Sequence, residues 1–384
     1  MKKLLFFSLF LIASLVSAQD VIDLNLLAAK KVKSTTSYSV SDNTIDFKGT
    51  KHPKEYWVKF VGTYSRSLHV KNFVGGTIIH ESNVTTNTSD KTFKFTDCRD
   101  WTINGEKAFL NGSGNNSGAM IWVTGKWQNC HLIGFTIDQK RNSSGTSTNG
   151  GPAVQFESYS DPLFNHGTLR ITKTVVRNAN DEAFYIMKTR ATAGYLDSLF
   201  ITETDVDKTG RDFWQLTNVR YTLIENNRGS NGGLERNADH VSGFSLNEKN
   251  ARVIIRNNVV TNTPQFAFSG GGGTTIFENN TFQQEQAPGG NQGLYLRDGD
   301  FIVKGNWFNA ANSIRSVIGL DKSKLTWDVS NTFIGKQAFY TFPGSSLSET
   351  PVINKTTVEV IEEKTSAGSK YYLNWNGQNI LIKP

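Results

Sequence analysis

The sequence predicts an all-β fold, a single-stranded right-handed parallel β-helix (a solenoid) with capped ends. Three observations lead to this fold class: a short phrase recurs along the chain, turn-forming residues are spread evenly with little proline, and no long stretch shows helical periodicity. The 384 residues are enough for a large core. A solenoid arranges such a chain as one elongated domain.

The recurring phrase is an apolar strand, a polar pair that ends in Asn, and one or two further apolar residues. It is clearest at 253–260, 275–282 and 302–308, where the Asn residues are Asn258, Asn280 and Asn306. Further copies lie at 98–103, 132–137, 171–176, 201–206, 223–227 and 327–333, which makes about nine turns. Asn at a fixed corner tolerates left-handed backbone and can hydrogen-bond to the Asn of the next turn. We therefore interpret these Asn residues as a structural ladder.

The ends of the chain differ from this repeat. Residues 1–18 have a basic start, a short apolar run and a small residue, Ala18, before the expected cleavage, so they are interpreted as a signal peptide. The protein is then secreted, periplasmic or on the cell surface, and no later stretch is long enough for a membrane span. Residues 19–91 are expected to form an N-terminal cap and first turns, 92–342 the β-helix, and 343–384 a C-terminal cap or tail. Within that tail, 357–361 and 371–375 can pair as a hairpin.

Charge and cysteine content limit the partners. The formal net charge is +7, which is compatible with an acidic polymer. The export signal and the lack of a dense basic cluster beyond 30–33 argue against nucleic acid. Cys98 and Cys130 lie one predicted turn apart and form either a disulfide or a stack of free thiols. Two cysteines without clustered histidines exclude a zinc site.

Each turn carries a second strand after the Asn corner. Because side chains alternate along a strand, alignment of these strands points one set inward: Phe184, Trp214, Phe244 and Leu296. The same alignment points another set outward: Tyr185, Gln215, Ser245 and Tyr295.

Polar residues precede these strands in three consecutive turns: Asp181 and Glu182, then Arg211 and Asp212, then Asp239 and His240. Since neighbouring turns are roughly 4.8 Å apart, the side chains are expected within about 10 Å of one another. Carboxyls at that distance raise at least one pKa. A protonated carboxyl beside an ionised one is what cleavage of a glycosidic bond requires.

Basic residues accompany this cluster, among them Lys188 after the first strand and Arg297 further along. The candidate catalytic residues are Glu182, Asp212, His240, Arg211 and Lys188. The candidate substrate-binding residues are Asp181, Tyr185, Asp239, Tyr295 and Arg297. The alternative is structural: solvated corner residues that cap strand ends and pair with Arg211, with the aromatic rings used for packing.

The phrases resemble those of secreted bacterial right-handed parallel β-helix proteins, the pectin-lyase-like superfamily. It includes polysaccharide lyases and polygalacturonase-type glycoside hydrolases. The resemblance covers most of 92–342 and concerns the fold. In the hydrolases, aspartates on successive turns and a nearby His build the site, and Asp181, Asp212 and Asp239-His240 follow a comparable order. The chain departs from that pattern: the adjacent Asp-Asp pair is Arg211-Asp212, the Gly-His-Gly phrase is Asp239-His240-Val241, and no Arg-Ile-Lys phrase follows.

Lyases of this shape use Lys, Arg or His as base, often with calcium held by carboxylates. The resemblance thus implies that calcium is a possible cofactor, held by Asp181, Glu182, Asp212 and Asp239, with Lys188, Arg211 or His240 as base. No motif specifies a metal site.

Two functions are compatible with the sequence. One is a secreted carbohydrate-active enzyme, a lyase or glycoside hydrolase, that acts on an acidic polysaccharide. The other is a non-catalytic glycan-binding, adhesion or phage-tail-like β-helix. An enzyme should bring the carboxylates together with perturbed pKa values, whereas a structural protein should disperse them. Trimeric tail proteins also expose an apolar stripe for assembly, and the aligned phrases show none.

Overall fold

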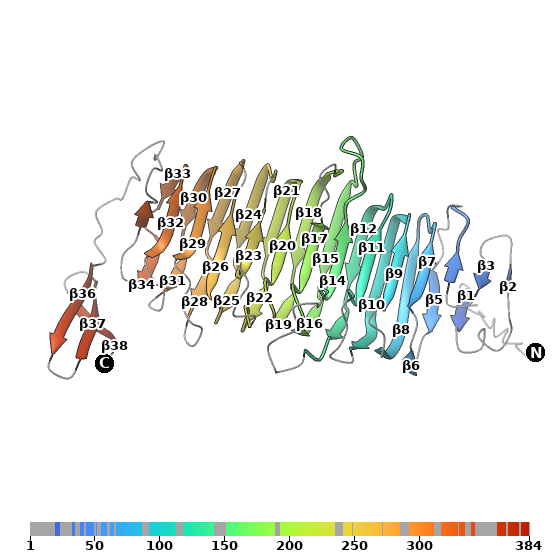
Figure 1. The fold of residues 1–384 in the computed structure, drawn as a ribbon, viewed down its shortest axis with the longest axis horizontal. Helices are drawn as coiled ribbons and strands as arrows, with labels where there is room; N and C mark the ends of the chain where they lie inside the picture. The colour runs from blue at the N-terminus through green and yellow to red at the C-terminus, as the bar shows by residue number, and fades with distance from the viewer. Residues whose placement is uncertain are drawn as a thin grey trace, which may run out of the picture.

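The protein is a right-handed parallel β-helix, and its strands stack side by side along the long axis of the molecule (Figure 1). The computed structural model describes residues 20–23, 33–34, 39–41, 44–49, 51, 55–59, 62–64, 67–86, 92–112, 118–141, 151–188, 193–234, 241–247, 249–270, 272–284, 292–310, 316–328, 330–334, 339–341, 359–365, 368–375 and 378–383. The predicted signal peptide lies outside these residues. The described part of the chain contains strands and no helix.

Sheet A is the 21-stranded sheet, in which most turns contribute two strands that form a first and a second ladder. The strands of the first ladder, together with β1, are β1 (Asp20–Asp23), β5 (Glu55–Lys59), β8 (Thr77–Thr86), β10 (Arg99–Asn111), β12 (Gln128–Ile133), β15 (Thr168–Thr172), β18 (Leu196–Thr202), β21 (Val219–Glu225), β24 (Arg252–Arg256), β27 (Thr274–Glu278), β30 (Asp300–Lys304) and β33 (Lys324–Trp327). The strands of the second ladder are β6 (Gly62–Tyr64), β13 (Thr136–Asp138), β16 (Val175–Ala179), β19 (Asp205–Thr209), β22 (Arg228–Ser230), β25 (Val259–Thr261), β28 (Thr281–Gln283), β31 (Trp307–Asn309) and β34 (Thr332–Ile334). The long strands β8 and β10 run through both ladders.

Sheet B is the 14-stranded sheet, with one strand from each turn. Its strands are β2 (Lys33–Ser34), β3 (Ser39–Ser41), β4 (Thr44–Asp46), β7 (Leu68–Lys71), β9 (Phe93–Thr96), β11 (Ile121–Thr124), β14 (Val154–Glu157), β17 (Phe184–Lys188), β20 (Trp214–Leu216), β23 (Ser242–Leu246), β26 (Gln265–Ser269), β29 (Gln292–Arg297), β32 (Ser316–Asp321) and β35 (Phe339–Thr341). Strands β2 to β4 pair antiparallel, and every later pairing in this sheet is parallel. Parallel pairing therefore already starts upstream of residue 92.

The core is a set of stacked side chains between the sheets. Trp214 and Phe244 lie on adjacent rungs with ring centroids 4.9 Å apart and rings 16° from parallel. Phe282 and Phe308 stack in the same way at 5.1 Å and 14°. The predicted inward residues Phe184, Trp214, Phe244 and Leu296 are all buried. Repetition of the apolar strand in each turn thus produces columns of like side chains, which is the source of the solenoid's stability.

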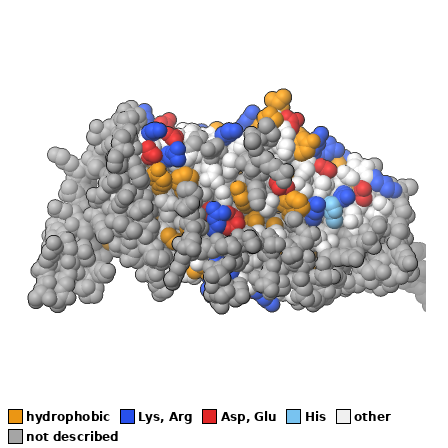
Figure 2. Space-filling model, viewed as in Figure 1, with side chains coloured by type: hydrophobic (Ala, Val, Ile, Leu, Met, Phe, Trp, Pro, Cys, Tyr) orange, Lys and Arg blue, Asp and Glu red, His pale blue; other side chains and the backbone are white. Residues whose placement is uncertain are grey.

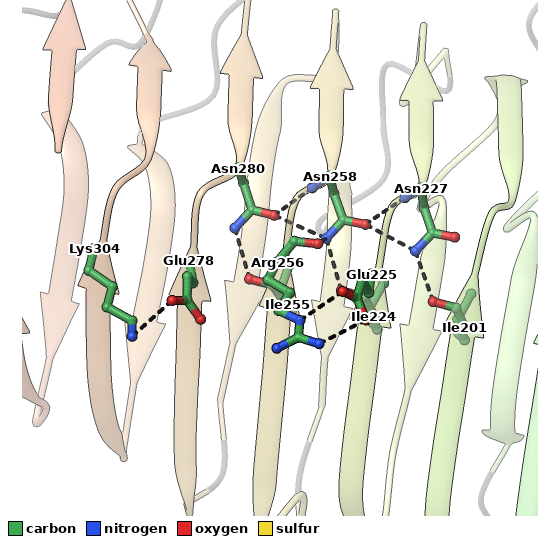
Figure 3. A network of polar contacts seen from close by, with 10 residues as sticks. All are labelled: Ile201, Ile224, Glu225, Asn227, Ile255, Arg256, Asn258, Glu278, Asn280 and Lys304. Atoms are coloured by element: carbon green, nitrogen blue, oxygen red, sulfur yellow. Dashed lines mark hydrogen bonds and ion pairs between the residues drawn. The ribbon is translucent and has the colours of Figure 1, made fainter. Parts of the chain in front are cut away.

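The Asn ladder is present at the bend between the two ladders of sheet A (Figure 3). Asn258 donates from Nδ2 to Oδ1 of Asn280 at 3.0 Å, and its own Oδ1 accepts from Nδ2 of Asn227 at 3.0 Å. The same contact continues from Asn280 to Asn306 and from Asn306 to Asn331. These side chains are buried, so the ladder satisfies amides that water does not reach.

One detail of the predicted corner is wrong. The left-handed backbone does not occur at the ladder Asn but at the residue before it. Asn257 has φ 56° and Asn279 has φ 53°, and Gly305 takes the same place with φ 65°. The side chains of Asn257 and Asn279 lie outside the core, whereas Asn258 and Asn280 point inward. In each pair, the first asparagine adopts the positive φ that the bend requires, and the second places its amide in the interior.

Cys98 and Cys130 are free thiols, and both are buried. Burial raises the pKa of Cys98 to about 12. Burial, and then the proximity of Cys98, raises the pKa of Cys130 well above its usual value. Of the two alternatives that the sequence leaves open, the structure has the unbonded pair.

We expect neither thiol to react with an alkylating reagent in the native protein, because only the thiolate attacks and neither sulfur is accessible. Both should react once the protein is unfolded in denaturant. A thiol titration with a chromogenic disulfide reagent, with and without guanidinium, measures this. Rapid labelling of the native protein would contradict the buried placement.

The C-terminal strands form a separate sheet. β36 (Glu359–Thr365), β37 (Gly368–Trp375) and β38 (Gln378–Lys383) pair antiparallel in that order. The expected hairpin between 357–361 and 371–375 is present, with Ile361 opposite Tyr372, and β38 extends it.

Candidate functional site

The two predicted catalytic carboxyls lie at the corner between the second ladder of sheet A and sheet B. β16 ends before this corner and β17 begins after it, and β19 and β20 flank the same corner one turn on. β17 and β20 pair with Phe184 opposite Trp214. Glu182 and Asp212 each come two residues before these positions, so they lie level on adjacent rungs, as the sequence alignment predicts.

Close backbone contact at this corner depends on Gly210. A Cβ at this residue would lie 2.1 Å from the carbonyl oxygen of Asn180 and 2.1 Å from Nη1 of Arg141. Arg141 donates from Nη1 to that carbonyl at 3.0 Å, and the backbone N–H of Asn180 donates to Oε1 of Gln139 at 2.9 Å. These residues brace the turn that carries Glu182. Sequence reasoning missed Gln139 and Arg141, because the polar run 138–142 leads into a long Ser-, Gly- and Asn-rich excursion and not directly into a strand.

Arg211 is the cation of the cluster. Its Nη1 lies 3.3 Å from Oε1 of Glu182, and its Nε lies 3.6 Å from Oδ1 of Asp181. The side chain of Arg211 is 33% exposed and that of Asp181 22%, whereas that of Glu182 is 0% exposed. The guanidinium and Asp181 therefore contact water, and the carboxyl of Glu182 lies behind them.

Burial shifts both carboxyls toward the protonated form. Burial first, and then the negative charges of Asp181 and Asp212, raise the pKa of Glu182 well above its usual value against the opposing effect of Arg211. Neither oxygen of Glu182 receives a hydrogen bond from a described residue. Burial also raises the pKa of Asp212 to about 7, although a hydrogen bond from the backbone of Ser242 and the charge of Arg211 oppose the shift. At neutral pH Asp212 is therefore partly ionised, and the shift of Glu182 favours its protonated form.

On the third rung, Ser242 lies beside Asp212. β20 and β23 pair with Trp214 opposite Phe244, which places Ser242 level with Asp212. The backbone N–H of Ser242 donates to Oδ1 of Asp212 at 2.6 Å, and its hydroxyl donates to Oε1 of Gln265 at 3.1 Å. The third strand of this row, β23, therefore begins with a serine at the level of Asp212. Asp239 and His240 lie outside the described residues.

The outward row of sheet B passes beside this corner. Gln155, Tyr185, Gln215 and Ser245 are neighbours on successive rungs. Tyr185 is half-buried, and burial followed by the charge of Glu182 raises its pKa to about 12. Gln215 is 7% exposed and Ser245 1%, although both point outward as predicted. The centre of this face is thus screened from water. Lys188 ends β17, and its side chain is outside the described residues.

Tyr295 and Arg297 do not join the carboxyl cluster. They lie on β29, four rungs from β17, which corresponds to roughly 19 Å. There the hydroxyl of Tyr295 donates to Oδ2 of Asp321 at 3.2 Å, and Nε of Arg297 lies 3.1 Å from Oδ2 of Asp298. Phe268 on the neighbouring strand packs against the ring of Tyr295 at 5.5 Å.

Basic and aromatic side chains occupy the N-terminal part of the same row. His69, Lys94 and Trp122 are neighbours on β7, β9 and β11. Nζ of Lys94 lies 4.6 Å from the ring centroid of Trp122. Burial, followed by the charges of Lys94 and Lys71, lowers the pKa of His69 to about 4, so His69 is neutral at neutral pH. Figure 2 shows acidic and basic side chains next to each other in small groups, with hydrophobic side chains nearby.

The described residues include no group of three or more His, Cys, Asp or Glu side chains placed to hold a metal ion. The predicted calcium ligands Asp181, Glu182 and Asp212 do not form such a group by themselves, and Asp239 is outside the described chain. The guanidinium of Arg211 already lies beside Glu182, so a metal ion would have to compete with Arg211 for this carboxyl.

The chain resembles known proteins in its fold but not in its sequence. No protein-family model matches the chain, and no curated protein matches its sequence. PfbA, a surface adhesin of Streptococcus pneumoniae, is 13% identical over 86% of this chain and 92% of its own, with a TM-score of 0.49. A double mutant of the periplasmic alginate epimerase AlgG is 12% identical over 84% and 83%, with a TM-score of 0.40. The tailspike of E. coli bacteriophage HK620, crystallised with a pentasaccharide, is 10% identical over 85% and 73%, with a TM-score of 0.41.

The fold is a right-handed parallel β-helix. The strand order and the parallel register carry this assignment. In the described part of the chain, no helix is long and apolar enough to cross a membrane.

Proposed function

We propose that this β-helix protein is exported and cleaves an acidic polysaccharide at the corner formed by Glu182, Arg211 and Asp212. The observation that carries the proposal is the pair of fully buried carboxyls on adjacent rungs, both with raised pKa values. Buried carboxyls whose oxygens are not all hydrogen-bonded destabilise a fold. Groups of this kind are concentrated at functional sites, where a shifted pKa serves proton transfer.

Each residue has a role that follows from its environment. Burial raises the pKa of Glu182 and favours its protonated form, which would donate a proton to the leaving oxygen of the glycosidic bond. Asp212, with a pKa of about 7, would act as the base: it would take a proton from the water that attacks the anomeric carbon in hydrolysis, or the ring C–H proton whose loss forms the C=C bond in elimination. Arg211 contacts water and would bind a sugar carboxylate or sulfate. The basic side chains Lys71 and Lys94 on the same sheet support an acidic polymer as the substrate.

Accessibility sets a condition on this mechanism. Both carboxyls have no contact with water, and Arg211, Asp181 and Tyr185 form the exposed edge of the cluster. A polysaccharide therefore meets Arg211 and Tyr185 first. Proton transfer then requires that the bound state opens the corner above Glu182.

The test is a panel of acidic and neutral polysaccharides, assayed both for unsaturated ends and for reducing ends. Asp212→Asn should lose cleavage by at least about 100-fold, the usual contribution of an acid or base. The matched control is Asp197→Asn, an exposed carboxylate on β18 paired with Arg220. Activity should rise as pH passes about 7, because Asp212 must ionise. Full activity of Asp212→Asn on a polymer that the wild type cleaves would refute the role.

The second candidate is binding without cleavage. It is favoured by the complete burial of the two carboxyls together with the half-exposed rings of Trp122, Tyr185 and Tyr295 on one row. Such rings stack on sugars. If the panel gives binding but no new chain ends, and Tyr185→Ala weakens that binding whereas Asp212→Asn does not, the protein is a glycan-binding module.

A further inference from the structure

Sheet A carries an outward apolar stripe that the sequence phrases did not reveal. Phe200, Leu223, Ile254, Ile276 and Ile302 are register neighbours on the five successive strands β18, β21, β24, β27 and β30. The residues that alternate with them face the core and are buried, whereas the five stripe residues are half-buried on the outer side. The expectation that no such stripe exists is therefore wrong, because it depends on a register that only the paired strands define.

The stripe has a defined end and a polar rim. At its N-terminal end, the guanidinium of Arg170 covers the ring of Phe200 at 4.3 Å. On one side, a row of charges runs parallel to the stripe on four successive strands: Glu225, Arg256, Glu278 and Lys304. An apolar centre with a polar rim is the composition of a protein interface.

The charge row alternates in sign. Nε of Arg256 lies 3.0 Å from Oε1 of Glu225, and Nζ of Lys304 lies 2.9 Å from Oε1 of Glu278 (Figure 3). Read from β21 to β30, the order is negative, positive, negative, positive. Read from β30 to β21, the order is positive, negative, positive, negative, so every position has the opposite sign. The row is therefore complementary to a second copy of itself that runs the other way.

We propose that two copies of this chain associate through this stripe, with their helix axes antiparallel. The two-fold axis runs along the strands, midway between β24 and β27. This operation lays each row over the same row of the second copy and reverses the order of the rungs. Leu223 then faces Ile302 of the second copy, and Ile254 faces Ile276. Glu225 faces Lys304 of the second copy, and Arg256 faces Glu278.

The opposite rim is compatible with the same arrangement. That rim consists of Tyr221, Arg252, Thr274 and Asp300 on the same four strands. In the antiparallel pair, Tyr221 faces Asp300 of the second copy, and Arg252 faces Thr274, so no like charges meet. A parallel pair would instead lay one rim over the other and bring Arg256 against Arg252 of the second copy. Like charges at an interface disfavour that orientation.

The size of the patch determines the strength of association. Five rungs and five residues per strand span roughly 19 by 13 Å. Even when the surface of protruding side chains is included, the area of the patch is well below the roughly 800 Å² per partner of a standard stable interface. The dimer is therefore weak, depends on protein concentration, and dissociates as salt screens the charge row.

The test is sedimentation velocity of the full chain over a concentration series at low salt. Wild type should show a monomer–dimer equilibrium, and Ile254→Lys should stay monomeric with an unchanged melt. Glu225→Lys alone and Lys304→Glu alone each place like charges across the interface and should weaken the dimer about tenfold or more. The double variant Glu225→Lys with Lys304→Glu restores opposite charges and should return to within about threefold of wild type.

The double variant separates association from folding. Within one copy, Glu225→Lys puts a lysine beside Arg256, and Lys304→Glu puts a glutamate beside Glu278, and the double variant keeps both repulsions. Its melt should stay as low as those of the single variants combined, while its association recovers. A wild type that is monomeric at every concentration overturns the proposal. So does a double variant that associates as weakly as the singles, which would mean that the charge rows do not face each other in reverse order.

Discussion

Replacement of Asp212 by Asn is expected to raise the melting temperature at pH 8, and to abolish the cleavage proposed for this site. The carboxyl has no contact with water, and its pKa is raised from the usual 3.8 to about 7. A shift of about three pKa units corresponds to a penalty on the order of 4 kcal/mol for the ionised form. Asn keeps the acceptor Oδ1 for the backbone N–H of Ser242 but must bury a new amide group, at about 1–3 kcal/mol. We expect a net stabilisation of about 1–3 kcal/mol.

The pH dependence has a definite sign. The folded pKa of Asp212 is above its unfolded value, so the folded state binds the proton more tightly than the unfolded state does. The protein is therefore most stable, with respect to this group, below about pH 4, and it loses that stability as pH rises through about 7. The advantage of Asp212→Asn should therefore be large at pH 8 and absent at pH 4. Paired thermal melts of wild type and variant at both pH values measure it.

The control for this experiment is Asp197→Asn, because Asp197 is an exposed carboxylate in an ion pair with Arg220. Exposed pairs contribute little, so its melt should change by less than about 1 kcal/mol in either direction. A destabilised Asp212→Asn at pH 8 would show that the ionised carboxylate is needed by the fold. The corner would then be a structural feature rather than a site held ready for proton transfer.

Asn258→Ala is expected to destabilise the protein by roughly 3–5 kcal/mol, whereas the adjacent Asn257→Gly should be nearly neutral. Asn258 donates to the carbonyl of Ile224 at 2.9 Å and accepts from the backbone N–H of Asn227 at 2.9 Å. Alanine leaves both buried groups without this partner. Asn257 sits outside the core with φ 56°, a conformation that Gly adopts freely, and Gly305 already has it on a later rung.

Chemical denaturation of the two variants checks this prediction, with the circular dichroism of the sheet as the signal. A solenoid can lose a few turns at a time, so the Asn258→Ala transition should also broaden or split. Equal stability of the two variants would mean that the ladder contributes no more than the turn conformation does.

The strand phrases predicted the fold because each one carries its own pattern. An apolar strand followed by a polar corner can bury its apolar side only against a neighbouring copy. The predicted inward residues Phe184 and Trp214 are the buried residues of the structure. The different roles of Asn257, which bends the chain, and Asn258, which points into the core, were not predictable in the same way. Both are asparagines, and only the backbone path decides which of them points inward.

The site was predicted in part for a related reason. Glu182 and Asp212 each lie two residues before the start of a strand. This spacing is visible in the sequence, so the two residues could be aligned without the structure. On the third turn Ser242 is level with Asp212, and Asp239 and His240 lie outside the described residues, so their contribution to the site stays a prediction. Gln139 and Arg141 brace the corner from the preceding turn, and nothing in their local sequence indicates it.

The sequence by itself determined the solenoid, the direction of side chains within each strand, and the acidic pair at one corner, because these depend on local periodicity and on chain-neighbour spacing. The tertiary structure alone decided which side chains lie level across turns. Turn lengths vary along the chain, and a shift of one residue moves a whole strand's side chains to the other face. That dependence on register explains why the burial and raised pKa of Glu182 and the stripe from Phe200 to Ile302 became apparent only once the turns were stacked.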